Sequence, residues 1–219
     1  VLLVTGDRGL AGAFNSQVIR AGTRLAGELG QQSMTPAWYV TGRRGSSSLA
    51  FRGYDVKGSY TGFSDKPGYA DARSVADDLV AGYVDGKLDR VELIFNSYVS
   101  PLTQTVTRET LLPIAQATIT GEGEDDADEN GGSRALVDYE PGPEEILRRL
   151  VPDYVEVSIY RALVESAAGF FGAQMTAMRN ASENAGDLIA SYTLQANRAR
   201  QAEITQEILE VVAGAEGVS

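Results

Sequence analysis

Histidine and cysteine are both absent from this chain of 219 residues. Without cysteine, neither disulfides nor thiolate metal sites can form. Without histidine, the chain lacks the commonest general base and the commonest metal ligand of proteins. Catalysis by a Ser-His-Asp or Cys-His arrangement is therefore excluded, and we expect no bound metal or cofactor.

Long apolar runs and an excess of positive charge are missing too. No run of about 18 apolar residues occurs, so no segment is expected to span a membrane. The formal net charge is −11, which argues against nucleic-acid binding because Lys and Arg must replace counterions at phosphates. Residues 1–4 are apolar but too few for a signal peptide. They resemble the middle of a buried strand, so we expect a fragment or a missing N-terminus.

Apolar spacing in the first part of the chain predicts alternating strands and helices. The predicted strands cover residues 1–5, 37–40, 55–60, 91–99 and 102–112, the last on a sheet edge. The predicted helices cover residues 10–29, 46–51 and 70–84. This order predicts an α/β fold, Rossmann-like, with a mostly parallel sheet. A short returning strand is predicted over residues 136–139.

An acidic segment separates this part from the rest. Residues 121–132 (GEGEDDADENGG) contain almost only acids and glycines, so they cannot bury enough apolar surface to order themselves. We predict a solvated surface loop. The head of an EF-hand calcium loop is matched by Asp126, Asp128, Asn130 and Gly131. The twelfth position would be Val137, where a bidentate Glu is required, so specific calcium binding is not expected.

The remaining residues predict a long helix. Residues 144–150 are helical in pattern, and Pro152 is expected to interrupt this helix or to open a second one. From residue 153 to 213 there is no proline and a heptad pattern persists, which predicts a coiled coil. About sixty helical residues extend roughly 90 Å, so most of this helix should project from the α/β part.

The coiled-coil seam is rich in small residues. One line of the seam contains Val157, Val164, Phe171, Met178, Ala185, Tyr192 and Ala199, and a companion line begins with Tyr160 and Ala167. Small side chains bury little area each, so such a helix needs a close partner along its length. The sequence contains no second long helix, and we therefore expect the partner to come from outside these residues. Two domains are predicted: an α/β domain over 1–141 and a coiled-coil helix over 142–219.

Three glycines early in the chain suggest one functional hypothesis, a dinucleotide-binding enzyme. Gly6, Gly9 and Gly12 follow a predicted strand and open a helix, which is the place of a dinucleotide-binding turn. Their spacing is G-x-x-G-x-x-G rather than G-x-G-x-x-G, and Asp7 and Arg8 lie where a pyrophosphate needs close backbone approach. Glycines that permit tight strand-to-helix packing are the simpler interpretation.

Two more pairs of residues favour the enzyme alternative. Arg43 and Arg44 follow the second strand, where an NADP enzyme could hold its 2′-phosphate, and Tyr83 and Lys87 have the Y-x-x-x-K spacing of short-chain dehydrogenases. Lys87 follows Gly86, so this pair falls at a helix end. An NADP-dependent oxidoreductase and a generic coiled-coil adaptor are kept as alternatives. The chain has no G-x-x-x-x-G-K-[ST] loop, so we expect no ATP hydrolysis by the chain alone.

Three segments resemble the γ subunits of F-type ATP synthases. Residues 5–15 (TGDRGLAGAFN) are similar to the family signature [ST]-D-[RK]-G-L-C-G-x-x-N, with Ala11 in place of the usual Cys. Residues 178–185 (MRNASENA) form the second segment. Residues 197–208 (NRARQAEITQEI) closely resemble N-x-x-R-Q-A-x-I-T-x-E-[LI]. The resemblance covers nearly the whole chain in matching order.

The resemblance implies a non-catalytic rotor, the central stalk that couples c-ring rotation to ATP synthesis or hydrolysis. In the family, an N-terminal helix pairs antiparallel with the C-terminal helix, and this coiled coil is the shaft inside the α3β3 hexamer. The α/β domain is the foot, which lies with the ε subunit on the membrane ring of c subunits. The implied location is the cytoplasmic side of a bacterial plasma membrane, peripheral and held through the complex.

The resemblance also implies contact residues. Gln201, Thr205 and Glu207 match positions that engage a β-subunit loop of the catalytic hexamer. Tyr139 and Glu140 match positions that face the c-ring loops and ε. Gln174 departs from the family, which usually has Arg there, so a contact with a β-subunit acid would be weakened. The acidic segment 121–132 is an insertion, and contact with a basic surface of the stator or c-ring is a hypothesis for it.

Overall fold

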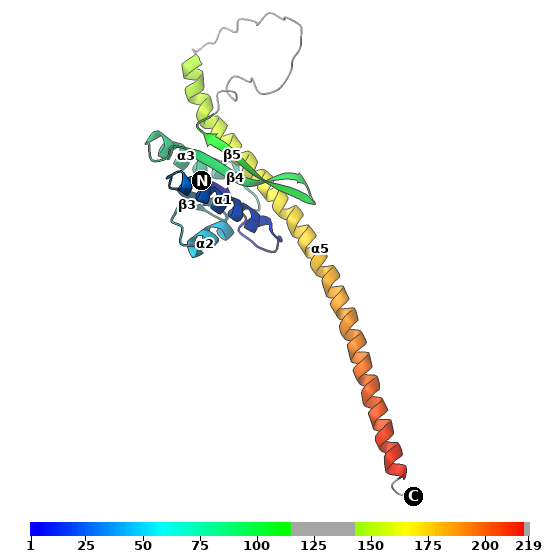
Figure 1. The fold of residues 1–219 in the computed structure, drawn as a ribbon. Helices are drawn as coiled ribbons and strands as arrows, with labels where there is room; N and C mark the ends of the chain where they lie inside the picture. The colour runs from blue at the N-terminus through cyan, green and yellow to red at the C-terminus, as the bar shows by residue number, and fades with distance from the viewer. Residues whose placement is uncertain (115–142, 217–219) are drawn as a thin grey trace, which may run out of the picture. The chain divides into compact units, whose positions relative to one another are not determined.

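The computed structural model of the chain describes residues 1–114 and 143–216 (Figure 1). They fall into two compact units, Val1–Met175 and Thr176–Ser219. The predicted strand over 136–139, the acidic segment 121–132 and its EF-hand candidates, and Tyr139 and Glu140 lie outside the described residues. The predicted domain boundary at residue 141 lies there too and stays a prediction.

The first unit contains a mostly parallel sheet. Its described strands are β1 (Leu2–Val4), β2 (Trp38–Thr41), β3 (Val56–Tyr60), β4 (Val91–Ser100) and β5 (Thr103–Leu112). Their order across the sheet is β3-β2-β1-β4-β5. β1 pairs parallel with β2 and β4, β2 pairs parallel with β3, and β4 and β5 form an antiparallel hairpin. The predicted fold class and the edge position of β5 are confirmed.

Helices cover both faces of the sheet, and two apolar cores result. Alternate residues of a strand point to opposite faces, and β1 follows this rule: Leu2 and Val4 belong to one core and Leu3 to the other. The Leu3 core includes residues of α1 (Phe14–Gln31) and α2 (Arg43–Phe51). The Leu2 core includes residues of α3 (Tyr69–Val84) and of α5 (Pro143–Glu216).

The starts of two helices differ from the prediction. The helix expected from residue 10 begins at Phe14, because Leu10 and Gly12 have φ angles of 65° and 57°, which a right-handed helix does not allow. The helix expected from residue 46 begins at Arg43. Its first turn is held by two earlier residues, since Arg43 N donates to Asp7 Oδ1 and Arg44 N donates to Gly6 O.

Helix α5 runs without a break through Pro152. The prediction that this proline interrupts the helix or opens a second one is therefore wrong. A proline inside a helix loses one backbone hydrogen bond, but packing can offset that loss. Pro152 is half-buried and lines an open groove with Ala76 and Val80 of α3. The next turns of α5 place Val155 and Ile159 in the core.

In the first unit, α5 presents different residues to the core and to solvent. Ile159, Leu163 and Phe170 are buried, whereas Val157 is 54% exposed and Phe171 is 50% exposed. The exposed positions belong to the predicted seam. In the second unit, Met178, Ala185, Tyr192 and Ala199 are all exposed. The seam is therefore open to a partner helix, and the pairing itself stays a prediction.

Candidate functional site

The crevice that a dinucleotide would occupy is filled by aromatic side chains. In open α/β sheets, ligands bind beyond the carboxyl ends of the strands, at the point where strand order reverses. Here Phe14 of α1 and Phe170 of α5 meet edge to face, with ring centroids 5.7 Å apart. A Cβ on Gly6 would lie 3.2 Å from the Phe170 ring. The cavity that remains is about 10 Å³, which is room for about one water molecule.

The anion position at the start of α2 is taken by Asp7. Its Oδ1 accepts the backbone N–H of Arg43 at 3.0 Å, and its Oδ2 accepts those of Gly62 at 2.9 Å and Ser64 at 3.3 Å. Burial raises the pKa of Asp7, but the hydrogen bonds from Ser64, Arg43 and Gly62 outweigh burial and hold it below its ordinary value. Helix N-termini favour negative charge, and here the chain's own carboxylate supplies it.

Asn15 closes the same turn from the other side. Its Oδ1 accepts the backbone N–H of Gly6 at 2.7 Å, and its Nδ2 donates to the carbonyl oxygen of Arg8 at 3.1 Å. Arg8 also forms an ion pair with Asp65, with 3.3 Å between Nη1 and Oδ2. The polar residues of the signature segment 5–15 thus hold its irregular backbone together.

Of the other residues of the enzyme alternative, Arg43 and Arg44 lie at this turn and hold its backbone, but Lys87 does not lie there. The Arg44 side chain covers Gly9, where a Cβ would lie 2.9 Å from Nη2. Lys87 lies beyond the end of α3 and pairs with Asp85, with 2.8 Å between Nζ and Oδ2. Lys87 lines a groove with residues at the N-terminal ends of β1 and β4. Gly9 follows the C-terminal end of β1, so the two residues lie at opposite ends of the strands. The oxidoreductase alternative is therefore without support.

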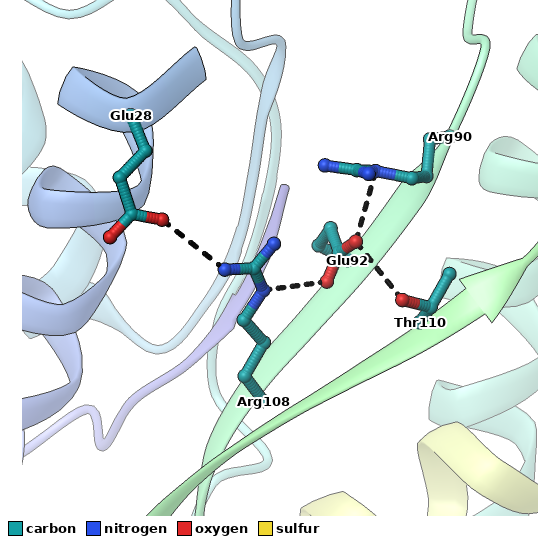
Figure 2. A network of polar contacts seen from close by, with 5 residues as sticks. All are labelled: Glu28, Arg90, Glu92, Arg108 and Thr110. Atoms are coloured by element: carbon teal, nitrogen blue, oxygen red, sulfur yellow. Dashed lines mark hydrogen bonds and ion pairs between the residues drawn. The ribbon is translucent and has the colours of Figure 1, made fainter.

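A buried carboxylate, that of Glu92, lies at the end of the sheet where β4 begins, and it joins several elements there (Figure 2). The Glu92 side chain is 4% exposed. Its Oε1 is 2.9 Å from Arg90 Nε and accepts from Thr110 Oγ1 at 3.0 Å, and its Oε2 accepts from Arg108 Nε at 2.9 Å. Arg108 also reaches Glu28 of α1 at 3.4 Å. A buried charge needs such partners. The network joins β4, β5 and α1, and we interpret it as stabilising the fold.

Helix α5 is attached to the β4–β5 hairpin by two charged residues. Glu165 accepts a hydrogen bond from Ser97 Oγ at 2.7 Å and another from the backbone N–H of Tyr98 at 3.3 Å. Arg161 forms an ion pair with Glu109 of β5, and its Nη1 is 3.6 Å from Glu165 Oε1. Neither residue was predicted from the sequence, although an Arg and a Glu four positions apart on a helix are a recognisable signal.

The other flank of α5 is attached to α3. Tyr69 Oη donates to Glu156 Oε2 at 2.8 Å, and Arg73 Nε is 3.7 Å from Glu156 Oε1. The rings of Tyr69 and Tyr160 meet edge to face at 5.6 Å. Further along, Gly172 lets the turn of the hairpin approach, because a Cβ there would lie 2.7 Å from the Pro101 carbonyl oxygen. Within the first unit, α5 is therefore held on two sides.

The predicted contact residues of the second unit are all exposed. Thr205 Oγ1 donates a hydrogen bond to the Gln201 carbonyl oxygen at 2.8 Å, inside the same helix. At 3.6 residues per turn, Gln201 and Thr205 are separated by about 40° around the axis, whereas Glu207 lies about 200° from Thr205. Gln201 and Thr205 thus share a face, and Glu207 belongs to nearly the opposite one.

Comparison with known proteins identifies the family. A family model described as ATP synthase matches residues 1–218. A protein of Frankia casuarinae called ATP synthase gamma chain is 42% identical over 223 aligned residues, covering 100% of this chain and 73% of that protein. One of Streptomyces avermitilis with the same name is 43% identical, covering 100% of this chain and 72% of that protein. The chain belongs to the ATP synthase gamma chain family.

Solved structures agree with this assignment. The central stalk and c-ring structure of the Tetrahymena thermophila mitochondrial ATP synthase contains a chain that is 28% identical with a TM-score of 0.62, covering 83% of this chain and 75% of that one. A chain from the Euglena gracilis mitochondrial enzyme shares the fold, with a TM-score of 0.69 at 16% identity, covering 99% of this chain and 71% of that one.

Family membership fixes the role of the chain. It is the rotary central-stalk subunit of the F1 sector of an ATP synthase, and it is not itself catalytic. Its association with the membrane is through the complex. Among the described residues, no helix has the length and apolar character to cross a membrane, and no group of acidic side chains is arranged to hold a metal ion.

Proposed function

We propose that this rotor subunit turns inside an α3β3 hexamer through α5 and stands with ε on the c-ring through its α/β unit. The location that goes with this proposal is the cytoplasmic face of a bacterial plasma membrane. The observation that carries the proposal is the surface of the second unit, in which Tyr192 is 63% exposed and Ile189 is 66% exposed. A helix with so many exposed apolar residues needs a partner to cover them.

The proposed partner for the seam is an antiparallel helix of the same subunit, from outside these residues. Small Ala185 and Ala199 alternate with large Met178 and Tyr192 along one line of the helix. This alternation suits knobs that enter holes on a closely approaching helix. The exposure of Val157 and Phe171, which belong to the same heptad line in the first unit, also supports the proposal.

The proposed contacts with the catalytic hexamer divide between two faces of α5. The Thr205 hydroxyl already donates to Gln201 O, so we propose that it accepts a hydrogen bond from a β-subunit loop while the Gln201 amide donates one. Glu207, on the other face, would contact the hexamer at a separate point. A hydrogen bond of this kind contributes about 0.5–1.5 kcal/mol, which is enough to bias a dwell position and too little to stop rotation.

Two further contact proposals rest on the resemblance alone. Tyr139 and Glu140 are proposed to face ε and the c-ring loops. The Gln at position 174 is half-buried in the first unit and cannot replace the charge of the Arg usual in the family. We propose that this chain makes a weaker contact there with a β-subunit acid.

The experiment uses the assembled complex in sealed vesicles. The double variant Gln201→Ala with Thr205→Ala should assemble normally and show a clear fall in ATP-driven proton pumping. The matched control is Thr193→Ala, because Thr193 Oγ1 makes the same kind of bond within its helix, to Ile189 O at 2.7 Å. Pumping by the double variant at the wild-type rate would remove both residues from the proposed contact, and failure of the wild-type chain to join the hexamer would overturn the proposal as a whole.

A further inference from the structure

We propose that Arg161 and Glu165 form a clamp that passes torque between α5 and the β4–β5 hairpin. We call this pair, with its partners Ser97, Tyr98 and Glu109, the α5 clamp. The proposal rests on the rotor role and concerns a different part of the chain from the hexamer contacts. A rotor must carry torque between its helix and its sheet, so some contact between the two must resist rotation of the helix about its own axis.

The clamp grips the hairpin at two separated points. Glu165 bonds Ser97 Oγ and the Tyr98 backbone on β4, and Arg161 pairs with Glu109 on β5. Glu109 pairs with Leu93 of β4. Leu93 precedes Ser97 by four residues, so the two contact points are about 13 Å apart along the strand. Arg161 and Glu165 are one helical turn apart, about 6 Å. The two ties therefore diverge from the helix toward both strands.

Directional contacts resist small rotations better than apolar contacts do. The buried side chains of Ile159 and Leu163 hold α5 against the sheet, but burial is non-directional and changes gradually with exposed area. A hydrogen bond weakens steeply when its distance or angle departs from the optimum. Bonds to a charged group are stronger still. At small angles, the stiffness of the attachment should therefore come mainly from the clamp.

The surroundings of the clamp support the same interpretation. The Arg161 guanidinium lies over the Phe95 ring, 5.8 Å from its centroid. This cation–π contact helps to fix its position in addition to its ion pairs. The Glu165 side chain is 25% exposed, unlike a fully solvated ion pair. The clamp also leaves the seam residues Val157 and Phe171 exposed. Gripping the sheet and pairing with another helix can therefore occur together.

The test measures torsional stiffness in the assembled complex. The hexamer is fixed to a surface, and a rigid optical probe is attached to the α/β unit through Arg52→Cys, an exposed position in a chain without native cysteine. Angular variance at a catalytic dwell is inversely related to stiffness. The variant Arg161→Gln with Glu165→Gln should raise that variance roughly two-fold, because only the packing and the ties of Glu156 to α3 then transmit the strain. Unloaded ATP hydrolysis should stay at the wild-type rate.

The control removes an ion pair elsewhere in the same unit. Lys87→Gln with Asp85→Asn deletes a solvent-exposed pair of the α3 end and should leave the variance unchanged. If the clamp variant assembles poorly, Ser97→Ala removes one donor to Glu165 with little risk to folding and should still raise the variance. A variance equal to wild type in either clamp variant would overturn the proposal. Failure of the hexamer contacts would show differently, as lost rotation of the wild-type chain.

Discussion

The carboxylate of Asp7 accepts a hydrogen bond from the backbone N–H of Arg43, 36 residues along the chain, with 3.0 Å between Oδ1 and N. This bond joins the turn after β1 to the first turn of α2. It explains how a Rossmann-like sheet with a glycine-rich turn can serve a rotor. Helix N-termini near such a turn commonly bind a phosphate; here the start of α2 binds the chain's own carboxylate, and Phe170 of α5 lies against Gly6 of the same turn.

Replacing Asp7 should therefore weaken the α/β unit. Asp7→Asn keeps the size of the side chain but loses charge and one acceptor, and we expect the free energy of unfolding to fall by about 1–2 kcal/mol at pH 7. The measurement is urea unfolding followed by fluorescence of the buried Trp38. Asp55→Asn is the control, because Asp55 is exposed and pairs only with Lys57 in the described structure. It should unfold like the wild type.

The difference in unfolding free energy between the wild type and Asp7→Asn should depend on pH. Hydrogen bonds hold the folded-state pKa of Asp7 below the ordinary 3.8, so the folded state favours the ionised carboxylate. The stability that this carboxylate contributes is complete above the ordinary pKa and is lost as pH falls through the folded-state value. The difference between wild type and Asp7→Asn should thus be constant near neutral pH and shrink below about pH 4. A difference that grows in acid would contradict this assignment.

Two glycines with similar backbone angles should respond very differently to alanine. Gly42 has a φ of 89° and Gly53 one of 81°, so both lie in the region that side chains rarely adopt. A Cβ on Gly42 would lie 2.0 Å from the Thr5 carbonyl oxygen, whereas one on Gly53 would meet nothing within 4 Å. Gly53→Ala should cost about 1–2 kcal/mol. Gly42→Ala should cost more than about 4 kcal/mol, or prevent folding. Equal melting temperatures would refute the steric argument.

Glu92 and Glu28 offer a test of burial, because both pair with Arg108. Glu92→Gln leaves Arg90 and Arg108 without their shared buried partner, so we expect a loss of about 2–4 kcal/mol of unfolding free energy. Glu28 is half-exposed, and its Oε2 is 3.4 Å from Arg108 Nη1. Glu28→Gln should therefore change the free energy of unfolding by less than about 1 kcal/mol. Chemical unfolding of the two variants side by side measures the difference. Similar losses would mean that burial is not what gives the network its strength.

The parts that the sequence could predict are those with local signals. Apolar periodicity located the strands and the edge position of β5, and the signature motifs identified the family. Long-range polar contacts could not be predicted in this way. Nothing in the spacing of Asp7 and Arg43 shows that they meet, so the early start of α2 was missed. The ties of α5 to Ser97 and Glu109 were missed for the same reason.

Helix α5 shows a second limit of sequence reasoning. The heptad pattern marks two apolar lines, one through Val157 and a companion through Tyr160, and it does not mark Ile159 and Leu163, which pack on the sheet. Pro152 was expected to break the helix because its local cost is known. The packing that offsets this cost comes from α3, about seventy residues earlier in the chain, and a local pattern does not report it.

Two alanines on the second unit test the seam directly. Ala185 lies on the predicted seam, and Ala190, five residues later, lies about 140° away around the helix. Both are exposed here, so Ala185→Glu and Ala190→Glu should change the helix content of the chain alone by the same small amount. In the assembled rotor only Ala185→Glu would bury a charge against the partner helix.

Such an unpaired buried charge costs several kcal/mol, so Ala185→Glu should sharply lower the yield and the thermal stability of the complex, while Ala190→Glu should match the wild type. The measurement is the yield of intact complex after gel filtration, together with its melting temperature by circular dichroism. If both variants assemble equally well, the line through Met178, Ala185, Tyr192 and Ala199 is not the packing seam. A loss confined to Ala190→Glu would move the seam to the other side of α5, because the two positions differ in angle around the helix and not in residue type.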